Sequence, residues 1–152
     1  MLNVYNLYKN MYNKSNEIPF KNKLKLTIIT LIMDLGFLIT LFTNRLNYYE
    51  LFTTITILIT HILFYKNLLQ KYNKENLDIL HCFVPILLLM SIGFSNKYLV
   101  LFSLYFITIV QFMWIVENKC ILNEKQDSWG MSKFSSVFSL GLTIVLSYKL
   151  GS

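Results

Sequence analysis

Five long apolar stretches follow one another along the chain, and the connections between them are short and polar. A hydrocarbon core about 30 Å thick takes roughly 17 to 25 helical residues to cross. With its flanking residues, each stretch reaches that length. Strands do not fit, because barrel strands alternate polar and apolar side chains at every second position. The pattern therefore predicts five transmembrane helices, near residues 24–43, 47–66, 78–96, 98–117 and 130–148.

The composition agrees with a chain built for a bilayer. Hydrophobic residues make up 55% of it and charged residues 14%, whereas a soluble domain carries roughly 25% charged residues. We therefore expect one all-α polytopic membrane domain over residues 24–149. The polar, basic tail of residues 1–23 has no apolar segment and cleavage site typical of a secretory signal. An amphipathic surface helix and a loosely ordered tail both fit its sequence.

Lysines predict the orientation of the bundle. They gather in the tail and in the second and fourth connections, while the opposite side receives only Arg45, Lys97 and Lys149. Since short basic loops stay inside, the N-terminus is predicted in the cytoplasm and the C-terminus across the membrane. Anionic lipid headgroups account for the net charge of +6. The expected partner is thus the lipid bilayer, with other membrane proteins or a second copy as further possibilities, and not a nucleic acid.

Four polar side chains fall in the inner half of the predicted bilayer, on four consecutive helices. At about 1.5 Å per residue, Asp34 lies near the midplane, and His61, His81 and Gln111 lie closer to the cytoplasmic ends of their helices. Polar groups in hydrocarbon normally face one another or a wet cavity. We therefore expect a shared polar cluster, the candidate site of a transporter or channel.

Asp34 itself has two interpretations. One is structural: a neutral or hydrogen-bonded carboxyl, served by Thr30 one turn back or by a polar residue across the interface. The other is a relay that passes a proton or cation between Asp34 and a histidine. No second intramembrane carboxylate extends such a path, because Glu50 and Glu117 lie at the ends of their predicted helices.

The histidines and cysteines do not form a cofactor signature. His61 and His81 lie at comparable depth and could hold a haem iron, but no repeated histidine pair or glycine-lined pocket accompanies them. Two cysteines and two histidines at irregular spacing do not predict a zinc site. We expect no cofactor and no metal. Cys82 and Cys120 fall on the cytoplasmic side, where thiols stay reduced, and Cys120 is a candidate for palmitoylation.

Close helix contacts need small residues, and the chain has no alanine. Glycines, serines and threonines must take that role. Gly36, Gly93 and Gly141 are the candidates, and Gly141 with its neighbouring serines makes the fifth helix a good candidate for tight packing.

The stretch "NYYELFTTITILITHILFY", followed by "LHCFVPILLL", resembles the androgen-induced-protein type of intramembrane threonine hydrolases. The resemblance implies Thr53 as nucleophile and His81 as its partner. Those proteins have a further span between the two motifs, whereas a single cytoplasmic turn separates them here. Thr53 would then lie near the outer face of the membrane and His81 near the inner face, roughly 10 Å or more apart along the bundle axis. A nucleophile and its base must lie within hydrogen-bond distance, which this separation exceeds.

The stretch "QFMWIVENKCILNEKQDSWG" is similar to helix ends in small uncharacterised multi-span proteins of large DNA viruses, which implies a host or virion membrane. The sequence thus leaves three functions. The first is a structural or scaffolding membrane protein without enzymatic activity, the second a small proton, ion or solute transporter, and the third an intramembrane hydrolase.

Overall fold

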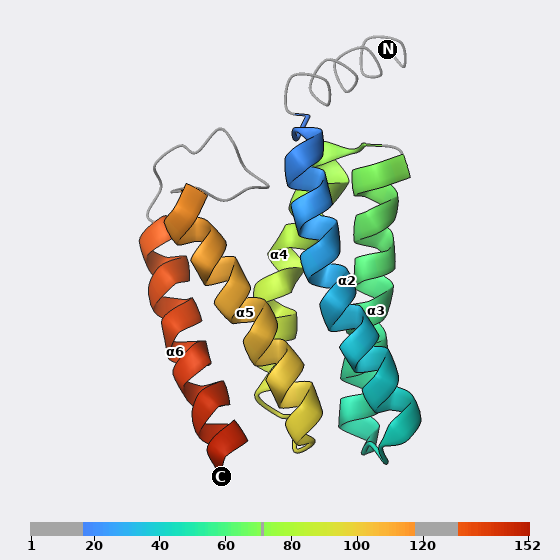
Figure 1. The fold of residues 1–152 in the computed structure, drawn as a ribbon, viewed down its shortest axis with the longest axis vertical. Helices are drawn as coiled ribbons and strands as arrows, with labels where there is room; N and C mark the ends of the chain where they lie inside the picture. The colour runs from blue at the N-terminus through green and yellow to red at the C-terminus, as the bar shows by residue number, and fades with distance from the viewer. Residues whose placement is uncertain (1–16, 71, 118–130) are drawn as a thin grey trace.

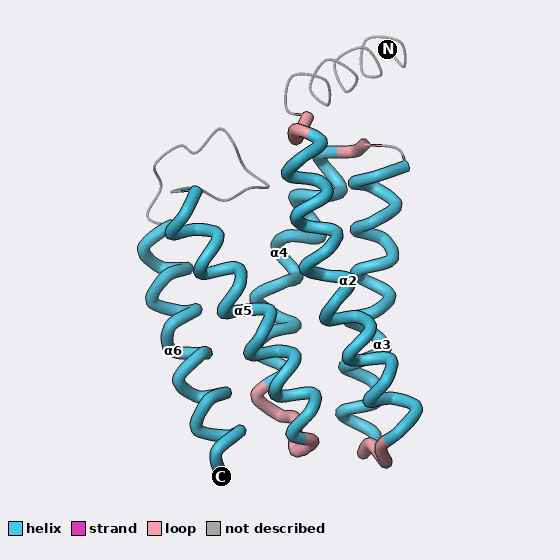
Figure 2. The backbone as a smooth tube through the Cα atoms, in the orientation of Figure 1, coloured by secondary structure: helices cyan, strands magenta, loops and turns pink. Residues whose placement is uncertain are grey.

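The computed structural model describes residues 17–70, 72–117 and 131–152, and within these ranges the chain is all-helical (Figure 1; Figure 2). The all-α prediction is confirmed for this part of the chain. The helices run alternately up and down, so that connected helices are antiparallel. Their bounds are α2 (Phe20–Thr43), α3 (Tyr48–Tyr65) with a π-helical turn η1 (Lys66–Gln70), α4 (Lys74–Ser91), α5 (Lys97–Glu117) and α6 (Met131–Gly151).

Four of the helices close into a ring and the fifth lies outside it. α2 packs against α3 and α5, while α4 packs against α3 and α5 from the other side. α6 packs along α5 (Figure 1). α2 and α4 begin at the end of the bundle nearest the N-terminus, called here the N-terminal end. The α2–α3 and α4–α5 turns and residue 151 lie at the opposite, C-terminal end.

Two helical segments are long and apolar enough to cross a membrane. They are Phe20–Thr43 and Tyr48–Gln70, the second including η1. Lys97–Met113 and Val137–Gly151 are shorter apolar helices. Large apolar side chains such as Phe42, Ile115 and Ile144 point outward, as expected where hydrocarbon surrounds a helix.

The third helix begins and ends earlier in the chain than predicted: it runs over Lys74–Ser91, whereas the predicted span was 78–96. Asn73 caps its start by accepting a bond from the backbone N–H of Asn76. Its end is set by the turn at 92–96, where the carboxylate of Glu50 accepts the backbone N–H groups of Ser95 and Asn96 at 2.7 Å each. Those two residues therefore belong to a turn and not to the helix.

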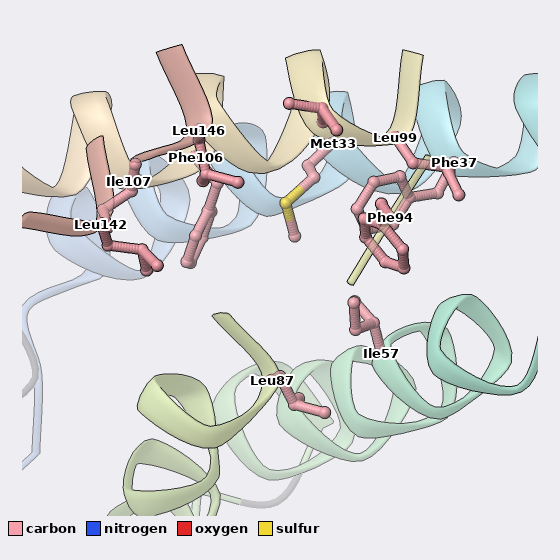
Figure 3. Packing of buried hydrophobic residues seen from close by; sticks show 11 residues of the cluster. Met33, Phe37, Ile57, Leu87, Phe94, Leu99, Phe106, Ile107, Leu142 and Leu146 are labelled. Atoms are coloured by element: carbon pink, nitrogen blue, oxygen red, sulfur yellow. The ribbon is translucent and has the colours of Figure 1, made fainter. Parts of the chain in front are cut away.

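The main core lies inside the ring and extends to α6, and Figure 3 shows its apolar side chains converging between the helices. Phe37 packs edge-on against both Phe94 and Phe102. A second, smaller cluster closes the N-terminal end, between the start of α2, η1 and the start of α4. Its buried members are Ile18, Phe64, Leu68 and Leu77.

Two of the three glycines named above permit close approach. A Cβ on Gly36 would lie 2.3 Å from the ring of Phe102, and one on Gly93 would lie 2.4 Å from the ring of Tyr49. A Cβ on Gly141 would meet nothing within 4 Å. Tight packing through Gly141 was therefore wrong within this bundle: the residue is exposed, although its helix packs along α5.

Candidate functional site

Asp34 lies on the inward face of α2, and its side chain is turned toward α3. The residue is only 6% exposed. Its Oδ1 lies 2.5 Å from Nδ1 of His61, and its Oδ2 accepts a hydrogen bond of 2.5 Å from the hydroxyl of Tyr65. Both carboxyl oxygens are thus occupied by α3, and we call these three residues the triad.

The helical repeat explains this arrangement. His61 and Tyr65 are four residues apart, so they project from the same face of α3, one turn above the other. A carboxyl with two oxygens can therefore bridge them from the facing helix. Thr30, one turn before Asp34, donates its hydroxyl bond to the carbonyl of Leu26. The expectation that Thr30 would serve Asp34 is replaced by two bonds across the helix interface.

The imidazole of His61 is itself enclosed. It is 7% exposed, and the ring of Phe106 on α5 lies 6.2 Å from it between centroids. Among the described residues, Asp34 is the hydrogen-bond partner of His61, through Nδ1. Nδ1 donates to Oδ1 or accepts from it according to the tautomer of the ring. The contact therefore fits a carboxylate with imidazolium, a carboxylate with a neutral imidazole protonated on Nδ1, and a carboxylic acid with a neutral imidazole.

A cavity of about 20 Å³ borders the His61 ring, which is room for about one water molecule. Met33, Ile57, Leu87 and Phe106, which line it, are labelled in Figure 3. Two hydroxyl groups, of Ser91 and Ser103, are its other polar lining. Both come from the C-terminal halves of the bundle, so the cavity extends from His61 toward the C-terminal end.

The structure brings together two of the four predicted cluster residues, Asp34 and His61. Gln111 lies elsewhere: its side-chain amide donates a bond of 2.9 Å to the Thr143 hydroxyl, joining α5 to α6. His81 is partly buried on α4 and is not a partner of Asp34. The sequence predicted how deep each residue lies along its helix. It did not predict the direction in which each side chain points around the helix axis, and that direction separates Gln111 and His81 from Asp34.

Tyr65 was missed by sequence reasoning. Its hydroxyl makes it amphipathic, and an amphipathic aromatic residue near a helix end is typical of a membrane interface. The signal that could have found it is its spacing of four residues from His61. The π-helical turn η1 begins directly after it, and such turns are rare and frequent at functional sites.

Thr53, the nucleophile implied by the hydrolase resemblance, is fully buried in the first two turns of α3, near the C-terminal end of the bundle. His81 lies near the N-terminal end of the antiparallel α4. Within the described chain, the hydroxyls of Thr53 and its neighbour Thr54 have no hydrogen-bond partner. No described base is therefore in contact with the Thr53 hydroxyl, and the hydrolase function stays a prediction from resemblance.

Glu50 lies at a helix end, as predicted, in the first turn of α3, and it is also a buried anchor. It is 3% exposed. Its Oε2 accepts the backbone N–H of Asn47 in a capping box, while Oε1 accepts two N–H groups of the α4–α5 turn. Tyr49 adds a bond from its hydroxyl to the carbonyl of Met90. The start of α3 thus holds the end of α4.

The described part of the chain holds no group of side chains suited to bind a metal ion. Cys82 is a free, exposed thiol, and Cys120 lies outside the described residues. Among the residues searched, no three histidine, cysteine, aspartate or glutamate side chains gather as metal ligands. Comparisons with protein-family models, with curated proteins and with solved structures find no match to this chain.

Proposed function

We propose that this chain is a five-span membrane protein that carries protons through its buried Asp34–His61 pair. The observation that carries the proposal is the contact of 2.5 Å between these side chains, inside a bundle whose outward faces are apolar. A paired acid and base can take up and release a proton with little rearrangement. Ionisable residues at membrane depth are costly and usually serve transport.

The five-span arrangement is part of this proposal. It is supported by the up-and-down order of the helices (Figure 1), by the two long apolar segments, and by the shorter apolar segments of α5 and α6. The lysine distribution supports a cytoplasmic N-terminal end. The resemblance to viral multi-span proteins supports a host or virion membrane as its location.

Proton flux into liposomes tests the function. The full chain is reconstituted with a pH-sensitive dye inside, and a potassium diffusion potential supplies the driving force. We expect the wild type to acidify the lumen, and Asp34→Asn to lower the flux to that of protein-free liposomes. Asp78→Asn is the matched control, because Asp78 is a half-exposed carboxylate outside the triad that pairs with Lys74. Wild-type flux equal to that of empty liposomes would overturn the proposal.

A structural role is the second candidate, and a different observation favours it. Polar bonds join α2 to α3 through the triad, α3 to the α4–α5 turn through Glu50, and α5 to α6 through Gln111. A bundle closed in this way could serve as a scaffold for other membrane proteins or for a second copy. This role predicts no flux, together with a loss of thermal stability in Asp34→Asn.

A further inference from the structure

The triad is a hydrogen-bonded chain with two different ends. Asp34 is its middle member, with His61 on one oxygen and Tyr65 on the other. At one end, the His61 ring borders the cavity that extends toward the C-terminal end of the bundle. At the other end, Tyr65 is partly buried, one turn closer to the N-terminal end, and packs beside the second core cluster.

We propose that Tyr65 is a proton-relay residue and that the relay runs from the N-terminal end through Tyr65, Asp34 and His61 into the cavity. This inference rests on the proposed function and names its route. It gives Tyr65 a role that no sequence motif assigned. The relay is short, one turn of α3, and lies between the second core cluster and the main core.

One transfer balances with the groups in place. The step starts from the carboxylic acid of Asp34 and a neutral His61 imidazole that carries its proton on Nε2. A hydronium ion on the N-terminal side gives a proton to the oxygen of Tyr65 and becomes water, while the hydroxyl proton of Tyr65 moves to Oδ2 of Asp34. The proton on Oδ1 moves to Nδ1 of His61, and the proton on Nε2 moves to a cavity water, which leaves as hydronium. Tyr65, Asp34 and His61 each give one proton and receive one, so all three are neutral again. The hydroxyl of Tyr65 already donates to Oδ2, which is the bond direction that this transfer needs.

The described groups around the triad and its cavity are mainly apolar side chains and hydroxyls. The residues that α4 and α5 place on the cavity are apolar except for the hydroxyls of Ser91 and Ser103. From α2, the neighbouring polar group is Thr30, bonded to its own helix. Toward the N-terminal end, Tyr72 packs on the second core cluster, and the ammonium of Lys23 lies 4.6 Å from its ring centroid.

The flux assay tests the route with a matched pair of variants. Tyr65→Phe removes one hydroxyl and keeps the ring, and we expect it to lower proton flux about tenfold or more. Tyr105→Phe makes the same change at another partly buried tyrosine, on α5 beside the main core, and should leave the flux unchanged. Thermal unfolding and gel filtration of both variants establish that the bundle is intact.

A second measurement separates a relay from a hydroxyl that only positions Asp34. A fluorinated tyrosine at position 65 keeps the hydrogen bond but has a more acidic phenol. A relay predicts that the pH of half-maximal flux shifts, and a positioning role predicts that it does not. The pH dependence of flux in the fluorotyrosine protein also distinguishes a relay from a positioning role if Tyr65→Phe fails to fold.

The two proposals fail in different ways. Flux that is abolished in Asp34→Asn but unchanged in Tyr65→Phe and in the fluorotyrosine protein overturns the relay and leaves the proton carrier standing. Wild-type flux equal to that of empty liposomes overturns both.

Discussion

Gly36 on α2 lies directly against the ring of Phe102 on α5, and a methyl group there would come within 2.3 Å of the ring. Phe102 packs edge-on against Phe37, with ring centroids 6.3 Å apart, so the ring has little room to move. We expect Gly36→Ala to lower the free energy of unfolding by about 2 kcal/mol through overpacking. Thermal denaturation in detergent measures the change.

Gly141→Ala is the matched control for that substitution. A Cβ there meets nothing within 4 Å, and alanine favours helix over glycine by roughly 1 kcal/mol. The control should therefore keep or raise the stability. Equal destabilisation by both alanines would show that the Gly36 contact does not matter.

The glycine positions show what the sequence could and could not predict. Because small residues are scarce, Gly36, Gly93 and Gly141 were predicted as the places of close approach. Gly36 and Gly93 are such places, and Gly141 is not. Which of them do so depends on the rotation of each helix about its axis and on which helices become neighbours. Long apolar runs carry little of that information, since all their faces are hydrophobic and the amphipathic signal is small.

The rotation of each helix about its axis also explains why only part of the predicted polar cluster forms. Depth along the helices placed Asp34 and His61 in the same half of the predicted bilayer, and the structure puts them in contact. Gln111 shares that depth and bonds to Thr143 instead, because α6 covers the opposite face of α5. Glu50 needed a partner 45 residues away in sequence. Contacts of that kind come from helix packing and not from a local pattern.

Two substitutions of Glu50 should lower the stability of the bundle to different extents. Glu50→Ala leaves three backbone N–H groups of residues 47, 95 and 96 without their acceptor, and we expect a loss of about 3 kcal/mol in unfolding free energy. Glu50→Gln should lose less, because its amide oxygen can still accept from Ser95 and Asn96. Urea or thermal unfolding in micelles measures both.

Glu17→Gln is the control for Glu50. Glu17 is an exposed partner of Lys23, at 2.7 Å, and a surface pair contributes roughly 0 to 1 kcal/mol. The anchoring role of Glu50 would be refuted if its glutamine and alanine variants were as stable as the Glu17 variant.

Removing the buried hydroxyl of Thr53 or Thr54 should raise the stability of the protein. Thr53 and Thr54 are fully buried without a hydrogen-bond acceptor in the described chain, and an unsatisfied buried polar group costs about 1 to 3 kcal/mol. Valine has the same shape without the hydroxyl, so Thr53→Val and Thr54→Val should each raise the melting temperature. Thr40→Val should lower it, because the Thr40 hydroxyl bonds to the carbonyl of Gly36. A lower melting temperature for both position-53 and position-54 variants would mean that these hydroxyls have partners.

The membrane arrangement makes a prediction that depends on parity. Five spans put a reporter before residue 17 and a reporter after Ser152 on opposite sides of the membrane, whereas crossing by α2 and α3 alone puts both on one side. We expect opposite sides, measured by the activity of compartment-specific reporter fusions to the full chain. A single cysteine in the turn at 92–96, in a background with both Cys82→Ser and Cys120→Ser, should react with a membrane-impermeant thiol reagent from the side of Ser152. Reaction from the N-terminal side would rule out the five-span order, since that turn and residue 151 lie at the same end of the bundle.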